Sequence, residues 1–376
     1  MNPAQSVPDL NRLQRLAMMA GAVGIVGCIA GLMIDSHQFF RSYLFGYVYW
    51  LGLALGSLGI VMLHNCVGGR WGVLIRQLVE SGMRTLPLMA LLVVPILFGI
   101  PVLYHWAHEE AVAVDKVLQW KQAYLNVPFF IGRTVLYFLI WIGLAFILRR
   151  PLRTTLRAVS APGLIIFVFT VTFASVDWIM SLEPHWFSTI YGAILLVGQA
   201  LNTLAFCVVL LYYLSDREPF KQILHPDLFQ DLGNLMLAFT VLWAYTSFSQ
   251  FLIIWSGNIP EETPWYIYRT RNGWQVVSVI LMLFHFAVPF FILLMRFVKR
   301  RARLLARVAL FMIFMRMVDL FYWIAPSEHH GFALHWMDIA APVGIGGVWI
   351  AVFVWLLKRG PLVDAHDPRL AAHGGH

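Results

Sequence analysis

Long apolar runs, each close to the length of a membrane-spanning helix, recur along almost the whole chain. A helix needs roughly 20 apolar residues to cross a bilayer, and ten segments fit that length. The predicted helices cover 16–34, 43–64, 86–104, 129–148, 161–180, 187–214, 232–256, 273–297, 303–325 and 337–357. The pattern predicts an all-α polytopic membrane protein that forms a single integral membrane domain over 1–376, with short tails at 1–15 and 358–376.

The composition agrees with a membrane-embedded chain. Hydrophobic residues make up 60% of it and charged residues only 12%, whereas soluble domains carry about 25% charged residues. The net charge of +8 does not indicate nucleic-acid binding, because the Lys and Arg residues are confined to a few connections. Cys28, Cys66 and Cys207 have no CxxC spacing, which excludes a cysteine-ligated iron–sulfur or zinc site formed by this chain alone.

The distribution of Lys and Arg predicts the orientation in the membrane. An even number of spanning helices places both termini on one side. The two tails and the connections on their side carry 20 of the 27 Lys and Arg residues, and the opposite connections carry five. Arg133 and Arg316 lie inside predicted helices. By the positive-inside rule, both termini are cytoplasmic.

Three local patterns refine this outline. Segment 70–84 has apolar residues on one face and charged residues off it, which predicts an amphipathic helix on the cytoplasmic interface. Pro95 and Pro289 lie inside predicted helices and are expected to kink them. The Gly-rich stretch 344–347 in the last helix is expected to allow close packing against a neighbouring helix.

The ninth predicted helix carries the strongest candidate for intramembrane chemistry. Arg316 and Asp319 are three residues apart and therefore share a face. Arg316 lies roughly 18 Å along the helix from Leu304, at or just past the midplane of a ~30 Å hydrocarbon core. The pair is either an element of a proton path or quinol-headgroup site, or a structural ion pair that locks the helix to a neighbour.

A second polar pair opens the last helix. His335 and Asp338 lie three residues apart on one outer turn. Asp338 is a candidate partner for Arg316 or a proton-relay group. The alternative is an acid near the helix N-terminus that is stabilised by the helix dipole.

Four uncharged or weakly basic side chains lie deeper in the predicted bundle. His285, in the middle of the eighth helix, is either a satisfied core histidine or a proton relay. A haem site is not favoured, because no helix carries the paired histidines of a di-haem bundle. Gln199 and Asn202 share one face of the sixth helix and either bond across helices or hold water. Gln250 adds polarity to the outer half of the seventh helix.

Motifs for a bound metal or cofactor are weak. Glu328, His329 and His330 are consecutive, but no further ligand at fixed spacing completes a metal site, so a solvated loop is favoured. The chain has no Gly-rich phosphate loop, no Ser–His–Asp order and no CxxCH haem attachment motif. No cofactor is therefore expected in this chain.

The stretch 175–190, SVDWIMSLEPHWFSTI, joins the fifth and sixth predicted helices. Asp177 lies in the last turn of one helix and Glu183 in the following turn. No Lys or Arg lies in this junction. The two acids therefore need a partner from another helix, from water or from protonation.

Several long motifs resemble the F subunits of alternative complex III, a quinol-oxidising respiratory assembly. These subunits belong to the wider NrfD-type (polysulfide-reductase-like) family of membrane proteins. The motifs are SVDWIMSLEPHWFSTIYG (175–192), FSQFLIIWSGNIPEETPWYIYRTRNGWQ (248–275), LFHFAVPF (283–290), RMVDLFYWIAP (316–326), HWMDIAAPVGIGGVWIAVF (335–353) and KRGPLVDAHDPRL (358–370).

The resemblance implies two four-helix bundles, helices 2–5 and 6–9, flanked by helices 1 and 10. It also implies that the chain lies in the bacterial inner membrane. There it would form a complex with an NrfD-like sibling, a multihaem cytochrome c and an iron–sulfur subunit, and this complex would pass electrons to cytochrome c or a terminal oxidase. Quinol, haem c and iron–sulfur clusters are expected in those partner subunits. The sibling reads roughly GWHTTI where this chain reads HWFSTI, so Phe187 stands in place of a His. The resemblance therefore places quinol oxidation in the sibling.

These observations lead to one leading hypothesis, a cofactor-free membrane subunit with a proton path. The path would run from Gln199, Asn202 and His285 near the midplane to outer residues. The outer residues of the candidate path are Gln250, Arg316, Asp319, His335, Asp338, Asp177 and Glu183. One alternative is a purely structural anchor, and another is a subunit with its own quinol site among the same outer acids. A third is a secondary transporter, but no internal repeat of the kind found in transporters is seen.

Overall fold

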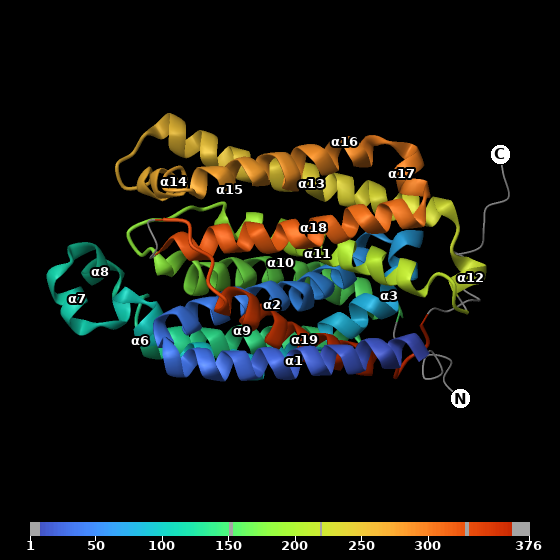
Figure 1. The fold of residues 1–376 in the computed structure, drawn as a ribbon, viewed down its shortest axis with the longest axis horizontal. Helices are drawn as coiled ribbons and strands as arrows, with labels where there is room; N and C mark the ends of the chain where they lie inside the picture. Colours follow the sequence, from blue (N-terminus) through green and yellow to red (C-terminus); the bar gives the residue numbers. More distant parts are fainter. Residues whose placement is uncertain (1–7, 150–152, 219, 328–330, 363–376) are drawn as a thin grey trace.

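The chain is helical throughout the part that the structure describes. The computed structural model describes residues 8–149, 153–218, 220–327 and 331–362, and these ranges contain helices and turns but no strand. Nine of the described helices are long and apolar enough to cross a membrane. The predicted all-α polytopic membrane class is therefore confirmed, and Figure 1 shows the long helices side by side.

Eight of the ten predicted segments form one continuous helix each. Seven of them are α1 (Pro8–Ile34), α2 (Ser36–Val67), α9 (Val127–Leu148), α10 (Arg153–Trp178), α11 (Tyr191–Leu214), α13 (Pro226–Gly257) and α19 (Met337–Leu357). The ninth predicted segment forms α18 (Ala302–Ile324), which is equally long. It is not among the nine because it carries three charged residues, Arg307, Arg316 and Asp319, within one membrane-spanning length.

The two remaining segments are interrupted at prolines, as expected for Pro95 and Pro289. The third segment consists of α4 (Leu86–Leu92), α5 (Val94–Phe98) and α6 (Ile100–Leu103), each with a proline in its first turn. The eighth consists of α15 (Trp274–Ile280), the π-helical turn η4 (Leu281–Ala287) and α16 (Val288–Leu294). Pro289 has no N–H to donate to the preceding turn, so the hydrogen-bond ladder widens just before it.

The long helices form two bundles with a flanking pair. The first bundle contains α2, α4 to α6, α9 and α10, and the second contains α11, α13, α15, α16 and α18. Both α2 and α10 contact α11, which joins the bundles. The flanking helices α1 and α19 pack on each other and on α2. In Figure 1, α1 and α19 lie along one edge and α13 to α16 along the opposite edge.

Glycines bring α1 and α19 into backbone contact. A Cβ atom on Gly24 would lie 2.2 Å from the backbone N of Gly344, and one on Gly347 would lie 2.3 Å from the backbone N of Gly21. The close packing predicted for 344–347 is therefore present. The two helices are antiparallel, so the described chain begins and ends at the same end of the bundle (Figure 1).

The amphipathic segment forms α3 (Arg70–Met83), but its apolar face contacts protein rather than lipid. Leu74 and Ile75 are fully buried, and α3 packs against α2, α11, α13 and α19. Its polar face is held to the bundle by ion pairing between Arg70 and Asp231 of α13. The predicted helix is confirmed, and its predicted place on the membrane interface stays a prediction.

Short helices occupy the connections. They are η2 (His105–Ala107), α7 (Glu109–Val114), α8 (Lys116–Lys121), η3 (Met180–Leu182), α12 (Phe220–Ile223), α14 (Pro264–Arg269), α17 (Arg296–Arg300) and η5 (Ala325–Ser327). The end of the bundle that holds 104–126, 179–190 and 258–273 is called the outer end below, after the predicted orientation.

Candidate functional site

Asp177 obtains its partner from another helix of the first bundle. The guanidinium of Arg133 donates from Nε and Nη2 to the two carboxylate oxygens, at 2.9 Å each. The hydroxyl of Tyr137 donates a third bond at 2.7 Å. Asp177 is fully buried, and Arg133 also lies over the ring of Tyr124 at 3.8 Å. This cluster is closed and charge-balanced, which favours a structural role for Asp177.

Glu183 is held by an arginine from the outer connection of the second bundle. Arg269 Nη2 donates to Glu183 Oε1 at 2.7 Å. The same guanidinium donates to the carbonyls of Tyr322 (3.2 Å) and Trp323 (3.0 Å) and stacks over the ring of Trp265. Arg269 is fully buried. It therefore fixes the 175–190 junction to the end of α18.

The outer connection 104–126 docks on the same junction. His185 Nε2 lies 2.6 Å from Asp115 Oδ2, and Lys121 Nζ donates to the carbonyl of Pro184. Desolvation alone would raise the pKa of Asp115. Hydrogen bonds from His185 and from two backbone N–H groups at the start of α8 outweigh it, so the pKa of Asp115 lies below its ordinary value.

Arg316 and Asp319 form the ion pair that their spacing predicts. Both side chains are buried, and Arg316 Nη1 donates to Asp319 Oδ2. The guanidinium points to α11, where its Nη2 lies 3.5 Å from the carbonyl of Leu195. Gly198 provides the space, because a Cβ there would lie 2.3 Å from Arg316 Cζ. The pair therefore joins α18 to α11 inside the second bundle.

A cavity of about 520 Å³ lies beside Asp319, between α13, α14, η4 and α18. We call it the second-bundle cavity. Asp319 and Gln250 both line it, and its other walls are mostly aromatic and aliphatic. Gln250 accepts a bond from Ser188 Oγ at 2.7 Å and donates to the hydroxyl of Tyr266 at 3.2 Å. Two predicted site residues thus meet at one cavity.

His285 lies on the π-helical turn η4, next to Trp243, which lines this cavity. It is 1% exposed, and neither ring nitrogen has a hydrogen-bond partner within the protein. Its ring meets the ring of Trp243 edge to face at 4.3 Å. Buried polar atoms are normally paired, but no protein group pairs with this ring. The core-histidine and the relay interpretations both stay predictions.

Gln199 and Asn202 are buried, but they lie away from the cavity. Gln199 contacts Gly52 of α2, so this face of α11 is the interface between the bundles. The side-chain oxygens of both amides have no partner within the protein. They are therefore free to accept from water or from a proton-carrying group at this interface.

Asp338 does not pair with Arg316, which corrects one predicted pairing. Its carboxylate accepts from Ser42 Oγ at 2.6 Å, from Gln38 Nε2 at 3.1 Å and from the backbone N–H of His335 at 2.9 Å. The pairing fails because α19 packs on α2, whereas Arg316 faces α11. His335 and Asp338 are thus joined as predicted, but at the flank of the first bundle.

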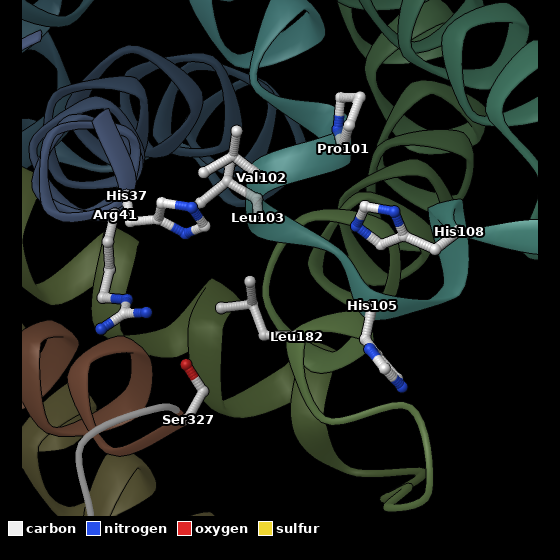
Figure 2. A pocket seen from close by; sticks show the side chains of 9 residues that line it. All are labelled: His37, Arg41, Pro101, Val102, Leu103, His105, His108, Leu182 and Ser327. Atoms are coloured by element: carbon white, nitrogen blue, oxygen red, sulfur yellow. The ribbon is translucent and has the colours of Figure 1, made fainter. Parts of the chain in front are cut away.

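A second cavity, of about 590 Å³, opens at the outer end near the start of α2. Figure 2 shows His37 and His108 pointing toward it from opposite sides, with Arg41 beside His37. Arg41 is 6% exposed, and Asp338 and Asp35 are the acids whose charges act on it. Basic side chains thus line this cavity, and it lies on the outer side of the hydrogen bonds that Asp338 accepts.

The sequence analysis did not predict that Arg133, Arg269 and Arg41 lie near the candidate acids. Arg133 is one of two arginines inside predicted helices and has no acid on its own helix. An intramembrane cation needs a counter-charge, so this signal pointed to the unpaired Asp177. Arg269 and Arg41 lie in or beside connections, and no comparable signal marks them.

In the described ranges, no group of three or more His, Cys, Asp or Glu side chains is placed to hold a metal ion. The predicted weak cluster of Glu328, His329 and His330 lies outside the described residues. A scan against protein-family models and a search of curated proteins found no match to this chain. The function proposed below therefore rests on the sequence motifs and on the geometry above.

Proposed function

We propose that the chain is a cofactor-free membrane subunit of a quinol-oxidising respiratory assembly of the alternative complex III type, within the NrfD-like family. It lies in the bacterial inner membrane with both termini in the cytoplasm. An NrfD-like sibling oxidises the quinol, and multihaem cytochrome c and iron–sulfur subunits bind at the outer end. Electrons pass to cytochrome c or a terminal oxidase. The long motifs and the polytopic helical fold support this proposal.

Within that assembly, the chain conducts protons through the second bundle. The observation that carries this role is the buried pair of Arg316 and Asp319 beside the second-bundle cavity. A carboxylate inside a membrane bundle is costly unless it has a function or a partner. Asp319 has both a partner and an adjoining space, so it can exchange a proton while Arg316 holds its position.

Hydroxyl groups lead from Asp319 toward the outer end. Tyr322 lines the cavity together with Asp319. Ser278 Oγ lies within hydrogen-bond distance of the hydroxyl of Tyr322 (2.8 Å) and of the carbonyl of Arg269 (3.0 Å). Arg269 in turn binds Glu183. These contacts form a polar line from the cavity that Asp319 lines to the junction.

A structural anchor is the second candidate, and the first bundle favours it. Asp177 makes three side-chain hydrogen bonds, two of them with an opposite charge. Such a closed cluster stabilises a helix pair but offers no group free to take up a proton. We therefore assign Asp177 to structure and Asp319 to proton transfer.

The test compares Asp319→Asn with Asp231→Asn in the intact complex reconstituted into proteoliposomes. Asp231 is about one-third exposed and pairs with Arg70, so it serves as a control for loss of an acid. We expect Asp319→Asn to keep quinol oxidation and to lower the number of protons released per electron, with no change in the control. Unchanged oxidation and unchanged proton release would refute the relay. Failed assembly, with normal turnover in any complex that forms, would favour the anchor.

A further inference from the structure

The cavity at the start of α2 lies where three membrane-spanning segments meet the outer end, and we call it the outer cavity. The spans Asp9–Ile34 and Arg70–Phe98 end there, and the span Ser36–Val67 begins there. His37 follows the first of these ends by three residues and Pro101 follows the second by three, and both line the cavity. The ends of spanning helices correspond to the boundary between the hydrocarbon core and the headgroups, so the outer cavity lies at the level of phospholipid phosphates.

Basic side chains line the outer cavity from two sides. His37 and Arg41 are four residues apart and therefore share one face of α2. His108 faces them from the connection that follows η2 (Figure 2), and His105 is a further lining residue. Among the described residues that line this cavity, none is acidic. A concave site whose charges have one sign attracts the opposite charge, so the lining favours an anion.

Arg41 is the cation best placed to hold that anion. Its side chain is buried, whereas those of His37 and His108 are exposed. The acids whose charges act on it, Asp35 and Asp338, also accept hydrogen bonds from other donors. A guanidinium has five N–H donors in a planar fork, so one edge can face an acid while another binds phosphate oxygens. Contacts of this charged, bidentate kind are among the strongest hydrogen bonds in proteins.

Lipid-facing side chains flank the outer cavity. Met33 and Ile34 at the end of α1 are 84% and 73% exposed, and Phe98 at the end of α5 is 78% exposed. The segment after Phe98 packs on α2, because a Cβ on Gly99 would lie 2.3 Å from the ring of Phe40. The basic lining and the apolar outer surface therefore adjoin each other. A soluble anion needs only the lining, whereas an anion that carries acyl chains uses both surfaces.

We propose that the outer cavity binds a phosphate group, supplied by the headgroup of an anionic phospholipid. The phosphate oxygens accept hydrogen bonds from Arg41 and from the imidazole N–H groups of His37 and His108. The acyl chains lie against Phe98 and Met33. Phosphatidylcholine carries the same phosphate together with a cation, which the basic lining repels, so the site prefers a lipid with net negative charge. The inference rests on the cavity and does not require the assembly proposed above.

The experiment titrates the delipidated full-length chain in non-ionic detergent micelles with phosphatidylglycerol or phosphatidylcholine, and native mass spectrometry counts the bound lipid. We expect a saturable site that binds phosphatidylglycerol about 10-fold more tightly than phosphatidylcholine. Arg41→Gln removes the charged fork and is expected to weaken phosphatidylglycerol binding about 10- to 100-fold. Lys116→Gln combined with Arg271→Gln removes two exposed cations of the outer end that do not line the cavity. This control is expected to leave the affinity unchanged.

His37→Ala combined with His108→Ala decides the question if Arg41→Gln does not fold, because both histidines are exposed and neither belongs to the core. The loss of two hydrogen bonds is expected to weaken phosphatidylglycerol binding about 3- to 30-fold. Phosphatidylglycerol binding that neither variant alters, or equal affinity for the two lipids, would overturn the phospholipid assignment.

A parallel titration replaces the lipid with inorganic phosphate and follows the phosphorus NMR line width. Line broadening that both variants abolish, without lipid binding at this site, would keep the phosphate site and assign it to free phosphate. If the variants change neither lipid binding nor phosphate binding, the proposal is wrong. These readouts need no electron or proton transfer, so a failure of the Asp319→Asn prediction leaves the phosphate site intact.

Discussion

The buried pair of Arg133 and Asp177 allows a quantitative test of which acids are structural. The perturbations are Asp177→Asn, Arg133→Met and the double change Arg133→Met with Asp177→Leu. Asp177→Asn leaves a buried guanidinium without a counter-charge. Arg133→Met leaves a carboxylate whose remaining side-chain donor is Tyr137.

The magnitude follows from the burial and the hydrogen bonds. The two side chains are 8% and 0% exposed and share two bonds of 2.9 Å. Breaking a pair of this kind from one side destabilises a protein by about 3–5 kcal/mol, whereas replacing both partners with apolar residues is often neutral. We therefore expect each single variant to lose about 3–5 kcal/mol, and the double variant to lie within about 2 kcal/mol of the wild type.

The assay is reversible unfolding in mixed detergent micelles with increasing dodecyl sulfate, followed by circular dichroism. Asp231→Asn is the control, because its pair with Arg70 is about one-third exposed on both sides and is expected to contribute about 0–1 kcal/mol. The reasoning fails if Asp177→Asn loses no more stability than this control, or if the losses in the two single variants simply add.

Three further predictions concern other parts of the junction and the second bundle. Gly198→Ala places a Cβ 2.3 Å from Arg316 Cζ and is expected to lower the free energy of unfolding by about 1–3 kcal/mol in the same assay. Gly143→Ala, with no atom within 4 Å, is expected not to destabilise the protein. Arg269→Lys removes the planar fork that reaches Glu183 and two carbonyls, and a loss of about 1–3 kcal/mol is expected; wild-type stability would contradict it. The pKa of Asp115 is lowered in the fold, so its stabilisation of α8 is present above its unfolded pKa of about 3.9 and is lost as pH falls below it. Hydrogen exchange of α8, corrected for the intrinsic effect of pH, should show this loss of protection, and constant protection down to about pH 2 would refute it.

Features that depend on neighbours along the chain were predictable. Apolar runs of about 20 residues predicted the spanning helices, because the length of the hydrocarbon core sets the length of the helix. Arg316 and Asp319 were predicted as a pair because residues three apart share a helix face whatever the helix packs against. The kink at Pro289 followed from the missing N–H of proline.

Features that depend on which helices face each other were decided only by the tertiary structure. Arg133 and Asp177 are 44 residues apart, and Glu183 and Arg269 are 86 apart. Each acid could have met any cation at the same depth, and the packing of the two bundles selected one. The same packing placed Asp338 on α2 instead of beside Arg316.

The stretch 175–190 illustrates the division. Its sequence by itself determined that two acids and two tryptophans stand where one helix ends and the next begins. Only the fold decided that Asp177 is closed off by Arg133, while Glu183 binds Arg269 at the end of α18. The physical reason is that a burial pattern is local to a helix, whereas the counter-charge and the cavity are formed by side chains from several helices.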